Sequence, residues 1–328
     1  MSRVGTADVL TTQHRTLPPP EDDEALIRVE ATGVSFAEVQ MLRGRYFNQP
    51  TFPFVPGYDL VGTVTAVGEN VSDVNVGQRV AAITETGAWA DRVLLPMETL
   101  APVPDGLDPA AIVAVVTNGV TAWQMLHRVA KVQRGDTVLV HGASGGVGTL
   151  LTQLARLSDV RVIGTASAGK QDAVRELGAI ALDYRDDDVP ARVAEIAPDG
   201  VDAVFDHVGG PGLVDSWRML GPDGTLVSYG VAGTLDATGH RLRPFVPVFA
   251  RLLCWKALPN GRNATFYYVN RWPRYFRGDV MRLFELLSEG ELKATIDERV
   301  PLSRASEALE KLDSGEVTGK VVLVPDGE

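Results

Sequence analysis

The sequence predicts an α/β protein in which a doubly wound parallel sheet is inserted into a second, β-rich domain. Short segments rich in Val, Ile and Thr fill the first hundred residues, and helical stretches alternate with short buried strands from Thr117 onward. The tail returns to mixed character. A chain of 328 residues has room for roughly two domains at about 150 residues each. We therefore place the β-rich domain at residues 1–117 and 271–328, and the inserted domain at 118–270.

The β-rich domain is expected from closely spaced strands that Gly, Pro, Asn and Asp residues interrupt. Its predicted strands are Ala25–Ala31, Gly62–Val67, Arg79–Ile83 and Ala90–Leu95. Such spacing is typical of a small barrel or a distorted sandwich. In the tail we expect helices near Gly278–Glu289 and Ser303–Asp313, followed by a closing strand at Gly319–Val324.

The inserted domain is expected from short apolar strands separated by helical stretches of about 10 to 15 residues. The predicted strands are Thr137–Val140, Val160–Thr165, Ala203–Phe205 and Thr225–Tyr229. This alternation indicates βαβ units and therefore a parallel sheet with helices on both faces. A later segment, Ala264–Val269, is expected to close the same sheet.

Composition excludes several classes of protein. The net charge is −11 and the chain contains one cysteine, Cys254, so neither an internal disulfide nor a four-cysteine zinc site is possible. An acidic chain is a poor candidate for nucleic-acid binding, which depends on clustered basic charge. Cys254 lies among apolar residues, which predicts a buried structural thiol.

The sequence also gives expectations about location. No signal peptide is visible near Met1, and no stretch approaches the roughly 20 apolar residues that span a bilayer. We expect a cytoplasmic protein without a membrane span.

The most informative segment is the strand Thr137–Val140 with the glycine-rich turn and the helical pattern that follow it. Glycines allow a backbone to turn tightly and approach a pyrophosphate, while a helix N-terminus offers free N–H groups. The candidate cofactor contacts within the turn are Ser144, Gly145, Gly146 and Val147. The alternative is a purely structural turn.

The end of the next strand indicates which nucleotide binds. An NAD site usually places Asp or Glu there, about 20 residues after the glycines. This chain has Ser167 followed by Lys170, which suits the 2′-phosphate of NADP(H) through hydrogen bonding and a point charge. Tyr184 and Arg185 follow the next short strand and could cover the same phosphate. The alternative for Lys170 is an ordinary solvated lysine at a helix start.

These patterns together resemble the quinone oxidoreductase branch of the medium-chain dehydrogenase/reductase superfamily, including its vesicle-protein-like members. The matching segments are Gly33–Glu38, Arg43–Tyr46, Pro56–Gly62, Gly77–Val80, Thr121–Ala122, Ala143–Gly148, Gly164–Ser167 with Lys170, Glu176–Ala179, Asp183–Arg185 and Thr318–Leu323. The resemblance implies a GroES-like catalytic domain, an inserted Rossmann domain and the cofactor NADPH. It further implies that Thr121, Tyr229 and Gly230 contact the cofactor, and that the strand within Ala264–Val269 pairs across a homodimer.

The same resemblance implies that no metal is bound. Zinc-dependent members of the superfamily place a cysteine where this chain has Ser35 and a histidine where it has Tyr58, and a later ligand falls near Thr117. Ser, Tyr and Thr do not form the Cys, His and carboxylate set that catalytic zinc requires. Without a metal to polarise a carbonyl, hydride transfer suits acceptors that already stabilise the incoming electron pair.

We therefore expect an NADPH-dependent, zinc-independent reductase of a small-molecule substrate, a quinone or an α,β-unsaturated carbonyl compound. Tyr46 is the candidate catalytic residue, donating a hydrogen bond or proton to the developing enolate, with Glu38 and Asp59 as candidates to orient it. The alternative is that Tyr46 only lines the site. Two other functions remain open, an enoyl thioester reductase and a low-turnover NADPH-binding regulatory protein.

Overall fold

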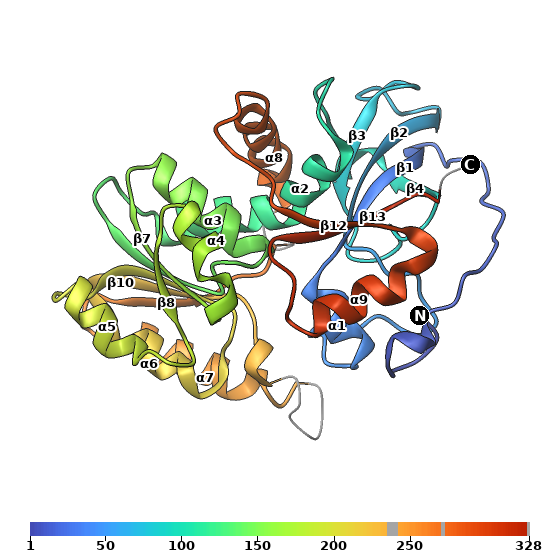
Figure 1. The fold of residues 1–328 in the computed structure, drawn as a ribbon. Helices are drawn as coiled ribbons and strands as arrows, with labels where there is room; N and C mark the ends of the chain where they lie inside the picture. Colours follow the sequence, from blue (N-terminus) through green and yellow to red (C-terminus); the bar gives the residue numbers. More distant parts are fainter. Residues whose placement is uncertain (235–241, 270–272, 327–328) are drawn as a thin grey trace. The chain divides into compact units, whose positions relative to one another are not determined.

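The computed structural model describes residues 1–234, 242–269 and 273–326 (Figure 1). Its contacts divide the chain into two compact units. One comprises Met1–Val120 with Arg274–Glu328, and the other comprises Thr121–Pro273. The limits predicted from sequence, after residues 117 and 270, lie three residues earlier in each case.

The first unit contains a seven-stranded sheet. Its strands run in the order β12-β13-β1-β2-β3-β5, and β4 pairs with β1. The strands are β1 (Glu24–Val34), β2 (Asp59–Val67), β3 (Arg79–Ile83), β4 (Arg92–Pro96), β5 (Ala101–Pro102), β12 (Ile296–Pro301) and β13 (Lys320–Val324). Alternate residues of β1, such as Ala25, Ile27 and Val29, are buried, and they form a core with Leu60 and Val80. This alternation is what an antiparallel sheet with one buried face requires. The unit also contains the short helices α1 (Phe36–Leu42) and α9 (Ala305–Asp313) and the longer α8 (Pro273–Ser288).

The second unit contains a six-stranded parallel sheet, in the order β11-β10-β9-β6-β7-β8. Its strands are β6 (Thr137–His141), β7 (Arg161–Ala166), β8 (Ile180–Asp183), β9 (Val201–Asp206), β10 (Leu220–Ser228) and β11 (Asn263–Phe266). Read from β8, this is the strand order of a dinucleotide-binding fold, with the order reversing between β6 and β9. The predicted doubly wound sheet is therefore confirmed.

Helices cover this parallel sheet on opposite sides. They are α3 (Gly146–Leu157), α4 (Gln171–Glu176), α5 (Val189–Ile196), α6 (Leu213–Arg218) and α7 (Phe245–Lys256). Figure 1 shows α3 and α4 on one face and α5, α6 and α7 on the other, as right-handed crossovers between parallel strands require. Asp188 caps the start of α5, its carboxylate accepting from Ala191 N at 3.2 Å.

By length and composition alone, one described helix is long and apolar enough to cross a membrane. It runs over Pro109–Ala130 and consists of α2 (Pro109–Trp123) and a π-helical continuation over Gln124–Ala130. The most apolar 18-residue window of this helix is 83% buried within the protein. A core helix of a folded domain meets the same criteria of length and composition.

The predicted burial of Cys254 is wrong. The apolar segment around it forms α7, whose residues Phe245, Val248 and Leu252 are buried. Cys254 and Leu253 are exposed. A helix turns by about 100° per residue, so a side chain two positions after Leu252 points away from the face that Leu252 buries. An apolar stretch does not by itself reveal which of its residues face the core.

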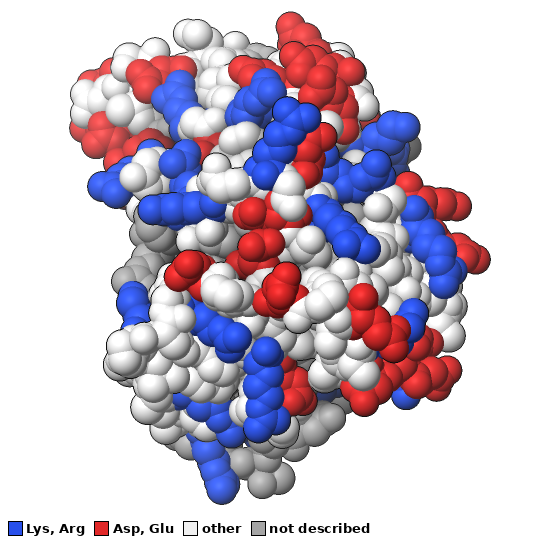
Figure 2. Space-filling view, turned by 90° about the vertical axis from the view of Figure 1, so that its left-hand side faces the viewer, with Lys and Arg blue, Asp and Glu red and all other residues white. Residues whose placement is uncertain are grey.

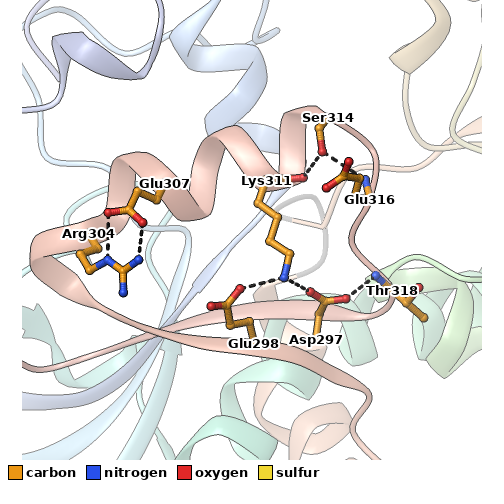
Figure 3. A network of polar contacts seen from close by, with 8 residues as sticks. All are labelled: Asp297, Glu298, Arg304, Glu307, Lys311, Ser314, Glu316 and Thr318. Carbon is orange, nitrogen blue, oxygen red and sulfur yellow. Dashed lines mark hydrogen bonds and ion pairs between the residues drawn. The ribbon is translucent and has the colours of Figure 1, made fainter.

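A polar network joins α9 to β12 in the first unit (Figure 3). The Lys311 ammonium lies 2.7 Å from both Asp297 Oδ2 and Glu298 Oε2, and Thr318 N donates to Asp297 Oδ1 at 2.9 Å. The hydrogen bond to Asp297, followed by that to Glu298, raises the pKa of Lys311. Exposed ion pairs of this kind contribute little to stability individually.

Glu38, Asp59 and Lys320 are buried charged side chains of the same unit that interact electrostatically. The Lys320 ammonium lies 3.5 Å from Asp59 Oδ2, and these side chains are 3% and 0% exposed. Asp59 Oδ1 accepts from Gly33 N at 3.0 Å. Glu38, at the start of α1, accepts from both the backbone N–H and the hydroxyl of Ser35. Burying charges is costly unless they are paired.

The pairing of Glu38 is incomplete. Within the described residues, its Oε1 atom has no hydrogen-bond partner, although the side chain is fully buried. Burial raises its pKa from 4.5 to about 7, against the opposing effects of Ser35 and Lys320. The folded protein therefore binds a proton at Glu38 more tightly than the unfolded chain does.

This proton linkage predicts a pH-dependent loss of stability. Because the pKa is higher in the folded state, stability should fall as pH rises from 4.5 to 7 and level off above, by about 3 kcal/mol for this group. Glu38→Gln removes the group, so urea unfolding midpoints should show the variant gaining on the wild type between pH 5 and 8. The exposed Glu69→Gln is the matched control. Parallel profiles for Glu38→Gln and wild type would contradict the prediction.

Candidate functional site

The glycine-rich turn lies between β6 and α3, where backbone segments approach so closely that side chains do not fit. A Cβ at Gly148 would lie 2.2 Å from the carbonyl oxygen of Gly142 and 2.7 Å from Ala143 Cα. Gly142 itself has a φ of +66°, a conformation that favours glycine. The N-cap is Gly145, so no side chain caps the first amide groups of α3. The turn thus presents N–H donors and the positive end of a helix dipole to an anion.

The predicted turn contacts lie at this helix start. Ser144 is buried at 7% exposure, whereas Gly145, Gly146 and Val147 are partly exposed. The loop is further held by Gly145 N, which donates to Gly142 O at 3.0 Å. Only backbone atoms lie at the closest approach between the turn and α3.

The residues predicted to bind a 2′-phosphate follow two neighbouring strands. Ser167 comes directly after β7, and Lys170 N donates to Ser167 O at 2.9 Å in the short turn that precedes α4. Tyr184 follows β8, and its N donates to Ala166 O at 3.4 Å. Since β7 and β8 pair in parallel, the structure brings these residues to the same edge of the sheet. The Tyr184 ring is 52% exposed, with the Arg185 guanidinium 5.4 Å from its centroid.

The second unit contains the three cofactor contacts that family resemblance implies, Thr121, Tyr229 and Gly230. Thr121 is buried within α2. Tyr229 follows β10, where its N donates to Asp206 O at 2.9 Å, and burial, with Asp206 adding to it, raises the pKa of its hydroxyl. A Cβ at Gly230 would lie 2.6 Å from His207 O, so this position also requires glycine. Tyr229 and Gly230 thus share the carboxyl-terminal edge of the sheet with the glycine-rich turn.

Sequence reasoning missed a set of polar side chains at that edge. His141 ends β6, Thr165 lies in β7 and Asp206 ends β9, and all three are hydrogen-bonded within one network with Ser216 of α6. Polar residues at the ends of buried parallel strands were the available signal, because ligands bind at that edge in open α/β sheets.

In the first unit, the structure pairs Tyr46 with Tyr58. Their hydroxyls are 2.8 Å apart, and their rings meet edge to face with centroids 6.3 Å apart. Both side chains are buried. The two carboxylates considered as orienting groups have other bonds: Glu38 binds Ser35, and Asp59 binds Gly33.

Ser35, Tyr58 and Thr117 stand at the positions that zinc ligands occupy in metal-dependent relatives. Ser35 uses its hydroxyl to bind Glu38, and the Tyr58 hydroxyl lies against that of Tyr46. Thr117 is buried, and neutral hydroxyls of this kind are not the usual donors to zinc. Nowhere in the described ranges do three or more His, Cys, Asp or Glu residues form a group able to hold a metal ion. The donor set at these positions does not fit zinc.

Two family models match the chain. One, described as an alcohol dehydrogenase GroES-like domain, covers residues 21–105, and the other, described as a zinc-binding dehydrogenase, covers residues 177–323. The second model does not include Ser35, Tyr58 or Thr117.

Known proteins resemble the chain over nearly its whole length. A human synaptic vesicle membrane protein VAT-1 homolog is 33% identical over 95% of this chain and 81% of its own length. The crystal structure of a Pseudomonas syringae quinone oxidoreductase superposes with a TM-score of 0.87, at 29% identity, over 99% of this chain and 98% of its own. A mycobacterial protein solved in complex with NADPH gives a TM-score of 0.86 at 32% identity, with the same coverage.

A probable quinone oxidoreductase of Schizosaccharomyces pombe is 32% identical over 99% of this chain and 95% of its own length. These matches cover both domains and show the family of the chain. The chain belongs to the quinone oxidoreductase branch of the medium-chain dehydrogenase/reductase superfamily.

Proposed function

We propose that this protein transfers hydride from NADPH to a quinone or an α,β-unsaturated carbonyl compound, and does so without zinc. The observation that carries the proposal is the turn between β6 and α3, which has no room for a Cβ at Gly148 and opens onto the uncapped start of a helix. Dinucleotide pyrophosphates bind at such turns. Membership of the oxidoreductase family supplies the reaction class.

The choice of NADPH is supported by the edge that β7 and β8 share. Ser167, not an acidic residue, follows β7, and Lys170 lies three positions later. A hydroxyl and an ammonium suit a phosphate, whereas a carboxylate there would favour the 2′-hydroxyl of NADH. The mycobacterial relative that was solved with NADPH is consistent with this choice.

In this proposal, the chain's own residues bind and orient the reactants. NADPH, when bound, supplies the hydride. The amides of the glycine-rich turn hold its pyrophosphate, and Lys170 holds its 2′-phosphate. Tyr46 Oη donates a hydrogen bond to the oxygen on which negative charge develops, and the Tyr58 hydroxyl, 2.8 Å away, donates to Tyr46 Oη as that charge grows.

Chemistry without zinc is supported by the residues at the relevant positions. Ser35 and Tyr58 have hydroxyls that bind partners within the protein. Quinones and conjugated carbonyl compounds spread the incoming charge over several atoms, so they need less polarisation by a Lewis acid than an isolated carbonyl does.

The remaining expectations about partners and location stay proposals. A small molecule is the proposed substrate, and nucleic acid is not a proposed partner. On the face in Figure 2, the described Lys and Arg side chains are interspersed with Asp and Glu, and the whole chain carries a net charge of −11. Such a mixture lacks the continuous basic surface that binds a phosphate backbone. We also propose that the protein is cytoplasmic.

We also propose a homodimer. The strand β11 ends the parallel sheet and pairs with β10 on one side. An exposed edge is a ready template for pairing with a second chain. The neighbouring helix α7 exposes Val246 and Leu253, at 64% and 69%, which adds apolar surface beside that edge.

Lys170→Ala should weaken NADPH binding by about tenfold or more, because a charge-assisted bond to the 2′-phosphate is lost. NADH lacks that phosphate, so its affinity should not change. Titration of both cofactors measures the effect, and Arg134→Ala, which removes an exposed charge elsewhere in the domain, is the control. Equal losses for NADPH and NADH would contradict the assignment of Lys170.

Loss of NADPH absorbance should occur with quinones or with enones in a substrate screen that also includes enoyl thioesters. Tyr46→Phe should lower kcat by about 100-fold with the KM for NADPH unchanged, because the variant loses the hydroxyl but not the ring. Turnover of enoyl thioesters alone would favour the thioester reductase, and silence with all three classes would favour a binding protein. Full activity of Tyr46→Phe would remove Tyr46 from the mechanism.

Sedimentation equilibrium should give a mass of about 70 kDa, twice the 35.2 kDa of one chain. Leu253→Asp places a charge on the exposed face of α7 and should weaken the dimer if that face is part of the interface. A wild-type mass near 35 kDa at micromolar concentration would contradict the proposed dimer.

A further inference from the structure

Four polar side chains form a continuous network at the carboxyl-terminal edge of the parallel sheet. His141 Nδ1 lies 3.2 Å from Thr165 Oγ1, and His141 Nε2 lies 3.1 Å from Ser216 Oγ. Ser216 Oγ is in turn 2.7 Å from Asp206 Oδ2. Thr165 Oγ1 also lies 3.2 Å from the backbone N of Gly142, the first glycine of the turn. Thr165, Ser216 and Asp206 are almost completely buried.

Both ends of this network have a fixed direction. The Gly142 N–H can only donate, so Thr165 Oγ1 accepts from it. At the other end, Asp206 Oδ1 accepts from the N–H groups of Val208 and Gly209, each at 2.8 Å. A carboxyl group that receives two amide donors is best stabilised as the carboxylate, which only accepts. The Ser216 hydroxyl therefore donates to Asp206 Oδ2.

These two ends determine the state of the histidine between them. The one proton of the Ser216 hydroxyl is directed at Asp206, so its oxygen accepts from His141 Nε2–H. Burial lowers the pKa of His141, against the opposing effect of Asp206, which favours the neutral ring. A neutral ring that is protonated at Nε2 has a bare Nδ1, and this atom accepts from the Thr165 hydroxyl.

We propose that these hydrogen bonds form a single directed chain, from Gly142 N–H through Thr165, the Nε2–H tautomer of His141 and Ser216 to the Asp206 carboxylate, and that the chain positions the glycine-rich turn for the cofactor pyrophosphate. His141, Thr165 and Ser216 are then positioning residues for cofactor binding. Each of these three side chains both accepts and donates, so every bond polarises the next.

The contacts of the turn show why its position depends on this chain. Thr165 binds the peptide N–H groups on either side of Gly142: its hydroxyl accepts from Gly142 N, and its carbonyl oxygen accepts from Ala143 N at 2.9 Å. The His207 ring lies against the other side of Gly142, where an added Cβ would be 2.4 Å from its Cε1. Loss of the Thr165 hydroxyl would leave Gly142 N–H and His141 Nδ1 without their partner in the chain.

The proposal rests on a dinucleotide being the ligand of the turn, so its first test uses the protein without cofactor. Long-range 1H–15N correlation spectra of histidine-labelled protein at pH 7 report which ring nitrogen carries the proton. The signals of His141 are identified by their loss in His141→Gln. We expect a neutral ring protonated at Nε2. A ring protonated at Nδ1, or at both nitrogens, would overturn the directed chain whatever the protein catalyses.

The second test compares two substitutions of Thr165. Thr165→Val keeps the shape and removes the hydroxyl, and should weaken NADPH and NADH by the same factor, about tenfold, because both share the pyrophosphate. Thr165→Ser restores the hydroxyl and should recover most of the affinity. Thr152→Val is the matched control, since the buried Thr152 hydroxyl on α3 has no hydrogen-bond partner among the described residues.

The outcomes separate positioning from a general structural role. A purely structural role would lower the melting temperature of Thr165→Val and leave both affinities unchanged well below it, which would overturn the positioning of the turn. A loss confined to NADPH would also overturn it, because that pattern belongs to the 2′-phosphate contacts. If Thr165→Val does not fold, the wild-type tautomer and the cofactor affinities of His141→Gln decide. A ring protonated at Nδ1, or a mixture of tautomers, contradicts the directed chain, and unaltered affinities for both cofactors in His141→Gln contradict its role in positioning the turn.

Discussion

Close backbone packing at the start of α3 is the constraint on which the rest of the nucleotide domain depends. No Cβ fits at Gly148, which faces the carbonyl oxygen of Gly142, and a Cβ at Gly164 would lie 2.7 Å from Ala143 Cβ. Glycine at these two positions lets the turn approach both β7 and the start of α3, and the parallel pairing of β6 with β7 and β9 brings the turn and the ends of those strands to one edge of the sheet. The proposed pyrophosphate site, the Ser167–Lys170 segment and the network around His141 therefore share that edge, where ligands bind in open α/β sheets.

Two buried polar clusters, one in each unit, differ in how completely their hydrogen bonds are satisfied. In the parallel-sheet unit, the hydroxyls and the ring nitrogens from Thr165 to Asp206 have partners that fix their orientation. A fully satisfied network of this kind makes a region rigid. In the other unit, Glu38 keeps an oxygen without a partner among the described residues, and its pKa rises to about 7. Burial of this carboxyl group thus makes the stability of that core depend on pH.

Sequence patterns predicted those features that arise from local spacing. The strand, turn and helix from Thr137 to Leu157 and the alternation of strands and helices are encoded within short windows, and the structure contains them. The exposure of Cys254 was not predictable from an apolar stretch, because all residues around it are hydrophobic and only the partner surface selects the buried face. Pairs such as His141 with Ser216, 75 residues apart, depend on how the strands assemble, and no local pattern records them. The same holds for the packing of Tyr46 against Tyr58, since neither residue type predicts its neighbour.

The contacts of Ser35 and Tyr58 give a physical reason why these two side chains do not suit zinc. Each hydroxyl binds a group inside its own unit, Ser35 to Glu38 and Tyr58 to Tyr46, and the adjacent Asp59 forms an ion pair with Lys320. A divalent cation would have to compete with these bonds and would meet the Lys320 ammonium near the carboxylate best suited to bind it. Gly33 makes that ion pair possible, because a Cβ there would lie 2.4 Å from Lys320 Nζ and 2.5 Å from Asp59 Oδ1. The cation that neutralises the Asp59 carboxylate is thus the Lys320 ammonium of the same unit. This ion pair supports the proposal that hydride transfer proceeds without a metal.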